Sequence, residues 1–152
     1  MRIRIRSGSI RDRVLSITLI AAVSAAVAML GYTISSPPAE PFTEFYILGS
    51  SGEAADYPKE LVVGEEGKVI VGIINREREA VSYSLEIKIN EVMNNRVEPV
   101  MLEHGEKWEE EVSFTPNRIG DKQQVEFFLY RQGQTEVYQE LYLWIDVMER
   151  AG

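Results

Sequence analysis

The 152-residue sequence contains no cysteine and only one histidine, His104. The absence of cysteine excludes disulfide bonds, thiolate metal ligands and cysteine nucleophiles. A general base or a metal ligand needs partner groups, and no second histidine is present to assist His104. We therefore expect no catalytic, cofactor or metal site and no enzymatic activity, and we interpret His104 as a solvated turn residue.

Positive charge is scarce after the first 13 residues. That short segment carries five arginines and one acid, Asp12, whereas the rest of the chain carries 11 basic and 23 acidic residues. The remainder therefore has a net charge of about −12, which repels phosphate backbones. We expect no nucleic-acid partner.

Long hydrophobic runs are also absent, with one exception that extends from Val14 to Ile34. As a helix these 21 residues would span about 31 Å, which matches a hydrocarbon core of ~30 Å. The preceding arginines predict that residues 1–13 form a cytoplasmic tail and that the chain then crosses the cell membrane. A cleaved signal peptide is the alternative, because Ala26-Val27-Ala28 has the small-x-small form of a cleavage site. We favour a retained anchor because the run continues past this tripeptide.

Residues 35–42 follow the predicted span and contain Pro37, Pro38 and Pro41. Proline fixes φ and removes a backbone donor, so this stretch should form a semi-rigid spacer.

After the spacer the hydrophobic pattern changes to a period of two, which is typical of strands. Strands are predicted at residues 43–49, 60–63, 68–75, 82–90, 97–102, 107–115, 123–130 and 136–147. Turns are expected at 91–95 and 131–135, and Pro99 indicates an edge strand. Strands at this spacing predict an all-β fold, an immunoglobulin-like antiparallel β-sandwich of about seven strands over residues 43–148, followed by a short tail. A barrel is the alternative.

Carboxylates are concentrated at Glu103 and Glu106 and in the run Glu109-Glu110-Glu111. Paired acids can cleave glycosidic bonds when their separation is correct. On a strand, however, Glu109 and Glu111 point to one side and Glu110 to the other. We expect the run to solubilise an exposed face. An enzyme that uses these acids is a further hypothesis for the function of the domain.

The last two predicted strands carry aromatic residues on the parity opposite to their apolar core face. These residues are Phe128, Tyr130, Tyr138, Tyr142 and Trp144. Flat rings with polar edges suit stacking on sugars or docking of a protein partner. We expect another strand or the N-terminal segment around Phe45 to cover this aromatic stripe. If the domain has a binding face, the stripe is the candidate.

Two stretches of the outer part resemble sandwich modules of prokaryotic surface proteins, including an adhesion-related module of bacterial and archaeal envelopes. They comprise residues 58–65, 74–75 and 83–85, and residues 102–108, 114–116 and 120.

A closer resemblance covers about 105 residues and includes residues 42–48, 64–65, 71–75 and 105–108 and the ending 129–147. These positions resemble the C-terminal extracytoplasmic region of DUF1616, an archaeal membrane-protein family of unknown function. The resemblance implies architecture and a membrane location, and it supplies no catalytic residues. Members often carry several transmembrane helices before this region, whereas this chain shows one.

Together these features predict a single-pass, extracytoplasmic binding or scaffolding module of the cell envelope that contacts an envelope protein. The alternative is a carbohydrate-binding or accessory subunit in the assembly of envelope glycans or glycoproteins.

Overall fold

The computed structural model describes residues 40–152, which form eight strands. They are β1 (Phe42–Leu48), β2 (Glu60–Val62), β3 (Gly67–Arg76), β4 (Val81–Ile89), β5 (Val92–Leu102), β6 (Lys107–Phe114), β7 (Gly120–Arg131) and β8 (Gln139–Met148). Within residues 40–152 there is no helix that could cross a membrane. The predicted span from Val14 to Ile34 and the basic tail before it lie outside the described residues.

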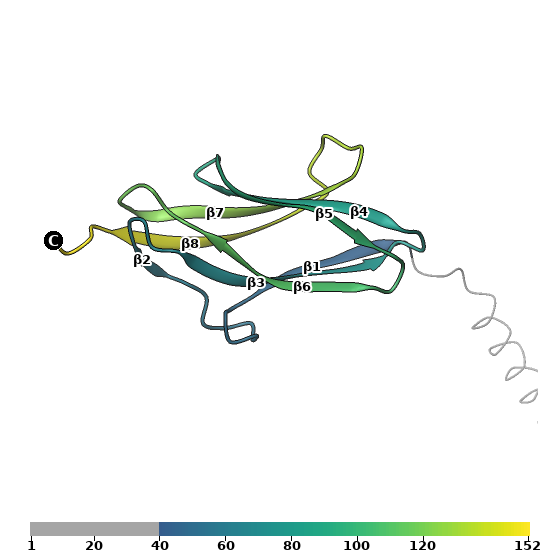
Figure 1. Ribbon diagram of the computed structural model, residues 1–152, viewed down its shortest axis with the longest axis horizontal. Coiled ribbons are helices and arrows are strands. Elements are labelled where there is room, and N and C mark those ends of the chain that lie inside the picture. The colour runs from purple at the N-terminus through teal and green to yellow at the C-terminus, as the bar shows by residue number, and fades with distance from the viewer. Residues whose placement is uncertain (1–39) are drawn as a thin grey trace, which may run out of the picture. The chain divides into compact units, whose positions relative to one another are not determined.

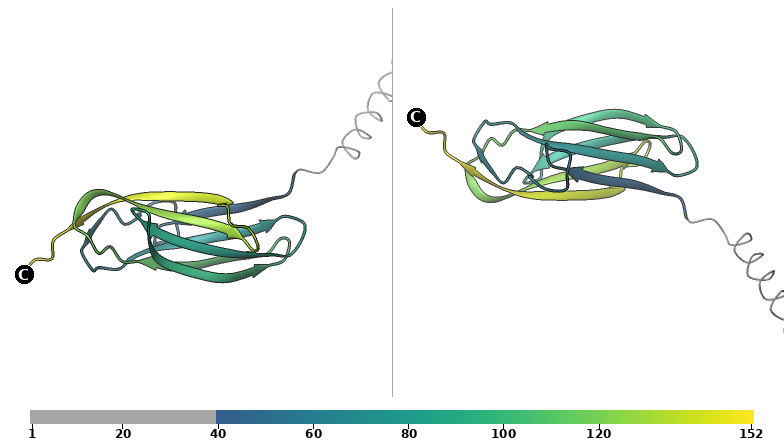
Figure 2. Two further views of the ribbon diagram at one scale, coloured as in Figure 1. Left: turned by 90° about the horizontal axis from the view of Figure 1, so that it is seen from above. Right: turned by 90° about the horizontal axis from the view of Figure 1, so that it is seen from below.

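The strands form two sheets that pack face to face (Figure 1). One has the order β1-β3-β6 and the other the order β2-β8-β7-β4-β5. The prediction of an all-β sandwich is confirmed, and so is the edge position of the strand containing Pro99. The prediction that all pairs are antiparallel is wrong for β2, which runs parallel to β8. Figure 2 shows the two layers from above and below.

Alternate residues of the facing strands fill the space between the sheets. The core includes Val69, Val71 and Ile73 of β3, Leu85 and Ile87 of β4, Val112 and Phe114 of β6, Val125, Phe127 and Leu129 of β7, and Ile145 and Val147 of β8. Phe114 and Phe127 join the sheets edge to face, with ring centroids 6.4 Å apart. This is a preferred geometry for aromatic pairs.

The turn between β4 and β5 is shorter than predicted. Ile89 pairs with Val92, so only Asn90 and Glu91 connect the strands, with φ values of 49° and 68°. Two left-handed residues make the twist that a two-residue hairpin needs. The prediction of a turn over 91–95 is wrong because glutamate replaces the glycine that usually marks such turns.

The hairpin loop between β7 and β8 extends from 132 to 138, and β8 begins at Gln139 rather than at residue 136. The cause is Tyr138, whose hydroxyl turns inward and donates to the buried carboxylate of Glu77. The outward parity predicted for Tyr138 is therefore wrong.

A buried polar cluster joins the two sheets at the end of the sandwich where Phe42 begins β1. The hydroxyl of Thr43 donates to Glu77 Oε1 at 2.8 Å, and the oxygens of Thr43 and Tyr83 lie 2.7 Å apart. Because threonine has one hydroxyl proton, Tyr83 must donate to Thr43. Burial raises the pKa of both Tyr83 and Tyr138. The cluster draws residues from β1, β4 and the β7–β8 loop around one carboxylate.

Asn75, which is fully buried, holds the chain around this cluster. Its Nδ2 donates to the carbonyl oxygens of Glu79 and Leu102, each at 2.7 Å. Its Oδ1 accepts from the backbone N–H of Glu77 at 2.7 Å. One side chain thus satisfies two backbone groups of the β3–β4 connection and one at the end of β5.

A bulge in β5 joins the neighbouring edge strands of the two sheets, β5 and β6. The register shift leaves Asn94 without a strand partner, and its side chain bonds both the N–H and the carbonyl of Thr115, each at 2.8 Å. Asn95 donates to the carbonyl of Ser113 at 2.8 Å. These bonds connect β5 of one sheet with β6 of the other.

Gly72 in β3 lies under the ring of its cross-strand partner, Tyr46. A Cβ added at Gly72 would lie 2.0 Å from Cζ of that ring. The hydroxyl of Tyr46 donates to Glu109, and burial together with this carboxylate raises the pKa of Tyr46 to about 12. An aromatic ring thus covers a glycine in the middle of the sheet.

We expect Gly72→Ala to lower the free energy of unfolding by about 1–3 kcal/mol, because the ring must leave its position. In a Tyr46→Ala background the same change should be neutral or stabilise by about 0.5–1 kcal/mol, since alanine is stiffer than glycine when unfolded. Urea denaturation followed by tryptophan fluorescence measures both. An equal cost in the two backgrounds would contradict the proposed contact.

We expect Asn94→Ala to lower the free energy of unfolding by about 1–2 kcal/mol, because two backbone groups of Thr115 lose their partner. Asn117→Ala, in the exposed loop after β6, is the matched control and should change it by less than about 0.5 kcal/mol. Similar losses in both variants would show that the β5–β6 connection has no special role.

Candidate functional site

The candidate site is the outer face of the five-stranded sheet, on the side away from the core. Val125, Phe127 and Leu129 of β7 point inward. The residues between them therefore point outward. Four of the five predicted stripe residues lie on this face: Phe128 and Tyr130 on β7, and Tyr142 and Trp144 on β8.

Tyr142 and Trp144 form the most exposed part of this face. Their relative exposures are 57% and 54%, and their rings meet edge to face with centroids 6.1 Å apart. The expectation that another strand or the N-terminal segment covers the stripe is wrong for these rings within the described residues. β1 pairs in the other sheet, and its Phe45 packs against the core.

Phe128 and Tyr130 are half-buried on the same face. Phe128 lies between Glu86 and Glu140 on the neighbouring strands, and the Lys88 ammonium lies 5.2 Å from the centroid of its ring. This geometry is that of a cation–π contact. Phe128 therefore forms part of a polar surface rather than an open apolar patch.

Tyr138 is the one predicted stripe residue that lies elsewhere. Besides bonding Glu77 it stacks with Arg131, whose Cζ lies 5.4 Å from the ring centroid. Arg131 also reaches the Glu77 carboxylate at 3.9 Å. Tyr138 thus belongs to the buried polar cluster and contributes no ring to the outer face.

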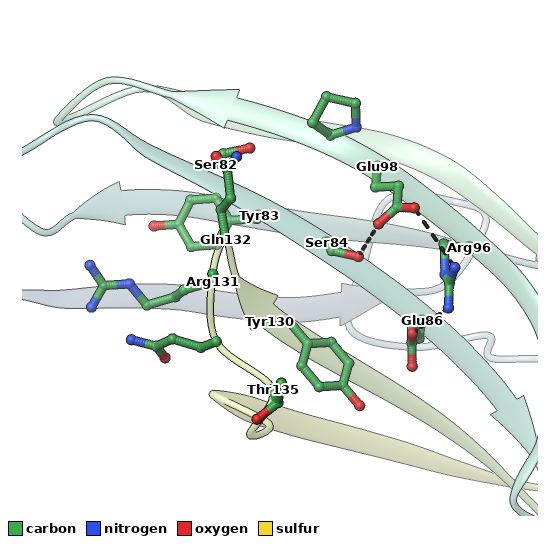
Figure 3. Close-up of a pocket in the computed structure, with 13 residues that line it drawn as sticks. Ser82, Tyr83, Ser84, Glu86, Arg96, Glu98, Tyr130, Arg131, Gln132 and Thr135 are labelled. Atoms are coloured by element: carbon green, nitrogen blue, oxygen red, sulfur yellow. Dashed lines mark hydrogen bonds and ion pairs between the residues drawn. The ribbon is translucent and has the colours of Figure 1, made fainter.

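Beside Tyr130 the face is hollowed into an open groove of about 740 Å³ (Figure 3). It is lined by outward residues of β4 and β5, by Tyr130 and by the β7–β8 loop from 132 to 135. A second bulge in β5 shapes it, because Glu98 and Pro99 both lie opposite Ser84. Bulges change the direction in which side chains point. Proline is tolerated at a bulge because the backbone N–H that it lacks is not needed there for strand pairing.

A connected row of polar side chains forms one wall of the groove (Figure 3). Ser84 Oγ donates to Glu98 Oε2 at 2.8 Å. The Arg96 guanidinium lies 3.8 Å from Glu98 Oε1 and donates to Glu86 Oε1 at 2.7 Å. Burial and the nearby Glu86 carboxylate raise the pKa of Tyr130. Its phenol is therefore neutral at ordinary pH.

This groove was not predicted from the sequence. The only signal for it in the sequence was Pro99, which indicated an edge strand but did not indicate how that strand pairs with its neighbour. The bulge depends on the pairing of β4 with β5, and a period-two pattern does not specify that pairing.

The remaining sequence candidates make local contacts. His104 is exposed in a turn, and its Nδ1 accepts from the backbone N–H of Arg78 at 3.0 Å. Glu109 bonds Tyr46, and Glu111 lies 3.5 Å from the ammonium of Lys68. In residues 40–152 no three acidic or histidine side chains are grouped so that they could hold a metal ion.

Similar folds occur in proteins of low sequence identity. The CARDB domain of the PF1109 protein from Pyrococcus furiosus, crystallised with di-metal ions, has a TM-score of 0.53 and 14% identity, over 76% of this chain and 100% of that one. Its solution NMR structure has a TM-score of 0.54 and 15% identity, over 74% and 100% of the two chains. A segment of a β-glucosidase from Listeria innocua has a TM-score of 0.50 and 17% identity, over 70% of this chain and 16% of that one.

These similarities show an immunoglobulin-like, CARDB-type β-sandwich. No protein with curated annotation matches the sequence. The family model described as a domain of unknown function, DUF1616, matches residues 36–146. Because this match covers most of the chain, the protein belongs to the DUF1616 family.

Proposed function

We propose that this chain is a non-enzymatic binding or scaffolding module of the cell envelope. One membrane span from Val14 to Ile34 would anchor it, and the sandwich would lie on the extracytoplasmic side. The arginine-rich start followed by an uncharged run of membrane length supports this orientation. The acidic domain would be repelled by anionic lipid head groups, which favours its projection away from the bilayer.

The exposed aromatic pair Tyr142–Trp144 is the observation that carries the proposed binding role. Tyrosine and tryptophan are enriched at the energetic centres of protein interfaces. Around the pair lie polar residues of the same face, including Gln124 and Glu126, which are its cross-strand partners. An aromatic centre with a polar rim is the usual anatomy of a protein-binding surface. We therefore propose an envelope protein as the partner of this pair.

A carbohydrate-binding or accessory role in envelope glycan assembly is the second candidate function. The polar groove beside Tyr130 favours it, because its wall offers an aromatic ring together with hydroxyl, carboxylate and guanidinium groups.

We expect the double variant Tyr142→Ser/Trp144→Ser to lose its envelope-protein partner, because truncated anchor residues typically weaken a complex more than about tenfold. The measurement is quantitative recovery of cross-linked partners with the full-length chain after mild detergent extraction. The same preparation tests the anchor, since the intact chain should be recovered with the membrane fraction.

The matched control is Val92→Ser/Ile119→Ser, at the first residue of β5 and in the loop before β7. It removes two apolar side chains that are 63% and 57% exposed and that are not paired with Tyr142 or Trp144. Partner recovery should be unchanged in this control. If both double variants keep the same partners while remaining folded, the aromatic pair is not the binding surface. Recovery of the intact chain in the soluble fraction would contradict the membrane anchor.

A further inference from the structure

We infer that the groove beside Tyr130 is a binding site for a neutral oligosaccharide. The inference rests on the proposed envelope binding role, but it uses a part of the outer face distinct from the Tyr142–Trp144 pair. Tyr130 pairs with Ser84 near the start of β4, whereas Trp144 pairs with Gln124 towards the opposite end of the sheet.

The shape of the groove suits a short polar chain. Its volume of about 740 Å³ lies within the range of ligand sites, roughly 300–1,000 Å³. The bulge at Glu98-Pro99 raises one side, and the loop 132–135 forms another. The half-buried ring of Tyr130 lies between them and offers a flat surface for the apolar face of a sugar ring.

The charge of the groove argues for a neutral ligand. Arg96 contacts both Glu86 and Glu98. Arg131, the other lining cation, contacts Glu77 and Glu79. A charged ligand could therefore bind a lining side chain of opposite charge only by displacing that side chain's present ion-pair partner. A phosphate or uronate would also face the carboxylates of Glu86 and Glu98, which repel anions.

The hydrogen-bonding groups of the groove match sugar hydroxyls, which both donate and accept. Lining side chains with the same dual capacity are Ser82, Ser84, Tyr130, Gln132, Gln134 and Thr135. The proton of Ser84 is used by Glu98, so its lone pairs remain able to accept from a ligand. The two carboxylates add further acceptors. A purely apolar ligand would leave these groups without partners at a cost.

The polar wall is arranged before any ligand binds. Glu86, whose side chain is 15% exposed, is held by Arg96 at 2.7 Å and lies 3.9 Å from the ammonium of Lys88. Arg96 and Ser84 together hold Glu98. Groups that are already ordered lose little rotamer freedom on binding, which favours affinity for a weakly interacting ligand such as a sugar.

The test is calorimetric titration of the full-length chain, in a detergent without a sugar head group, with three sets of probes. These are linear neutral hexose oligosaccharides of several linkages, an oligogalacturonate and an oligolysine peptide. We expect at least one neutral oligosaccharide to bind and neither charged probe to bind. Tyr130→Ala should weaken that binding about tenfold through loss of the aromatic surface.

A second variant keeps the test decisive if Tyr130→Ala does not fold. Thr135→Trp places a large side chain on the exposed loop at the groove and should abolish oligosaccharide binding without altering the core. Val92→Ser/Ile119→Ser, at two exposed residues that do not line the groove, is the matched control, and its oligosaccharide affinity should stay within about twofold of the unmodified chain.

Absence of binding by every neutral oligosaccharide, or tighter binding of oligolysine or oligogalacturonate, would overturn the inference. So would oligosaccharide binding that survives Thr135→Trp. The proposed function fails separately, through unchanged partner recovery in Tyr142→Ser/Trp144→Ser. A chain that keeps its protein partner but binds no sugar would thus refute the groove assignment alone.

Discussion

The buried polar cluster around Glu77 and Asn75 is the constraint on which the rest of the domain depends. Apolar burial holds the two sheets together, but it is non-directional and does not specify how the loops lie. Hydrogen bonds specify how the loops lie, because a buried donor or acceptor without a partner costs about 1–3 kcal/mol. Tyr138 turns inward to donate to Glu77, so β8 begins late and the β7–β8 loop lies where it can line the groove beside Tyr130. The hydrogen bond of Tyr138 to Glu77 in the buried polar cluster thus helps to position the loop that lines the groove on the outer face.

The outer face combines two surfaces of different chemistry on neighbouring strands. At one end the bulge opposite Ser84 and the ion pairs of Arg96 form a polar groove in which the charges already have partners. Towards the other end Tyr142 and Trp144 expose a pair of rings. The groove suits a small neutral ligand, and the aromatic pair suits a larger partner. A module that presents both could hold a glycan and an envelope protein on the same sheet.

Much of this architecture follows from the alternation of apolar and polar residues. It predicted an apolar core face on β7 and β8, and it placed Phe128, Tyr130, Tyr142 and Trp144 on the outer face. The features it missed depend on contacts between distant residues. The inward turn of Tyr138 requires Glu77, and the two bulges in β5 require its register with β4. A period of two assigns a ring to a face but does not show whether another strand covers it, and so the exposure of Tyr142 and Trp144 was not predicted.

The most direct test of the role of the polar cluster is the free energy of unfolding of Asn75→Leu. Leucine has the same number of side-chain heavy atoms and the same branching as asparagine, but it would leave the N–H of Glu77 and the carbonyls of Glu79 and Leu102 without their partner. If directional hydrogen bonds hold this end of the domain, chemical denaturation should show a loss of about 3 kcal/mol or more. An unchanged or higher stability would mean that apolar packing alone joins the sheets.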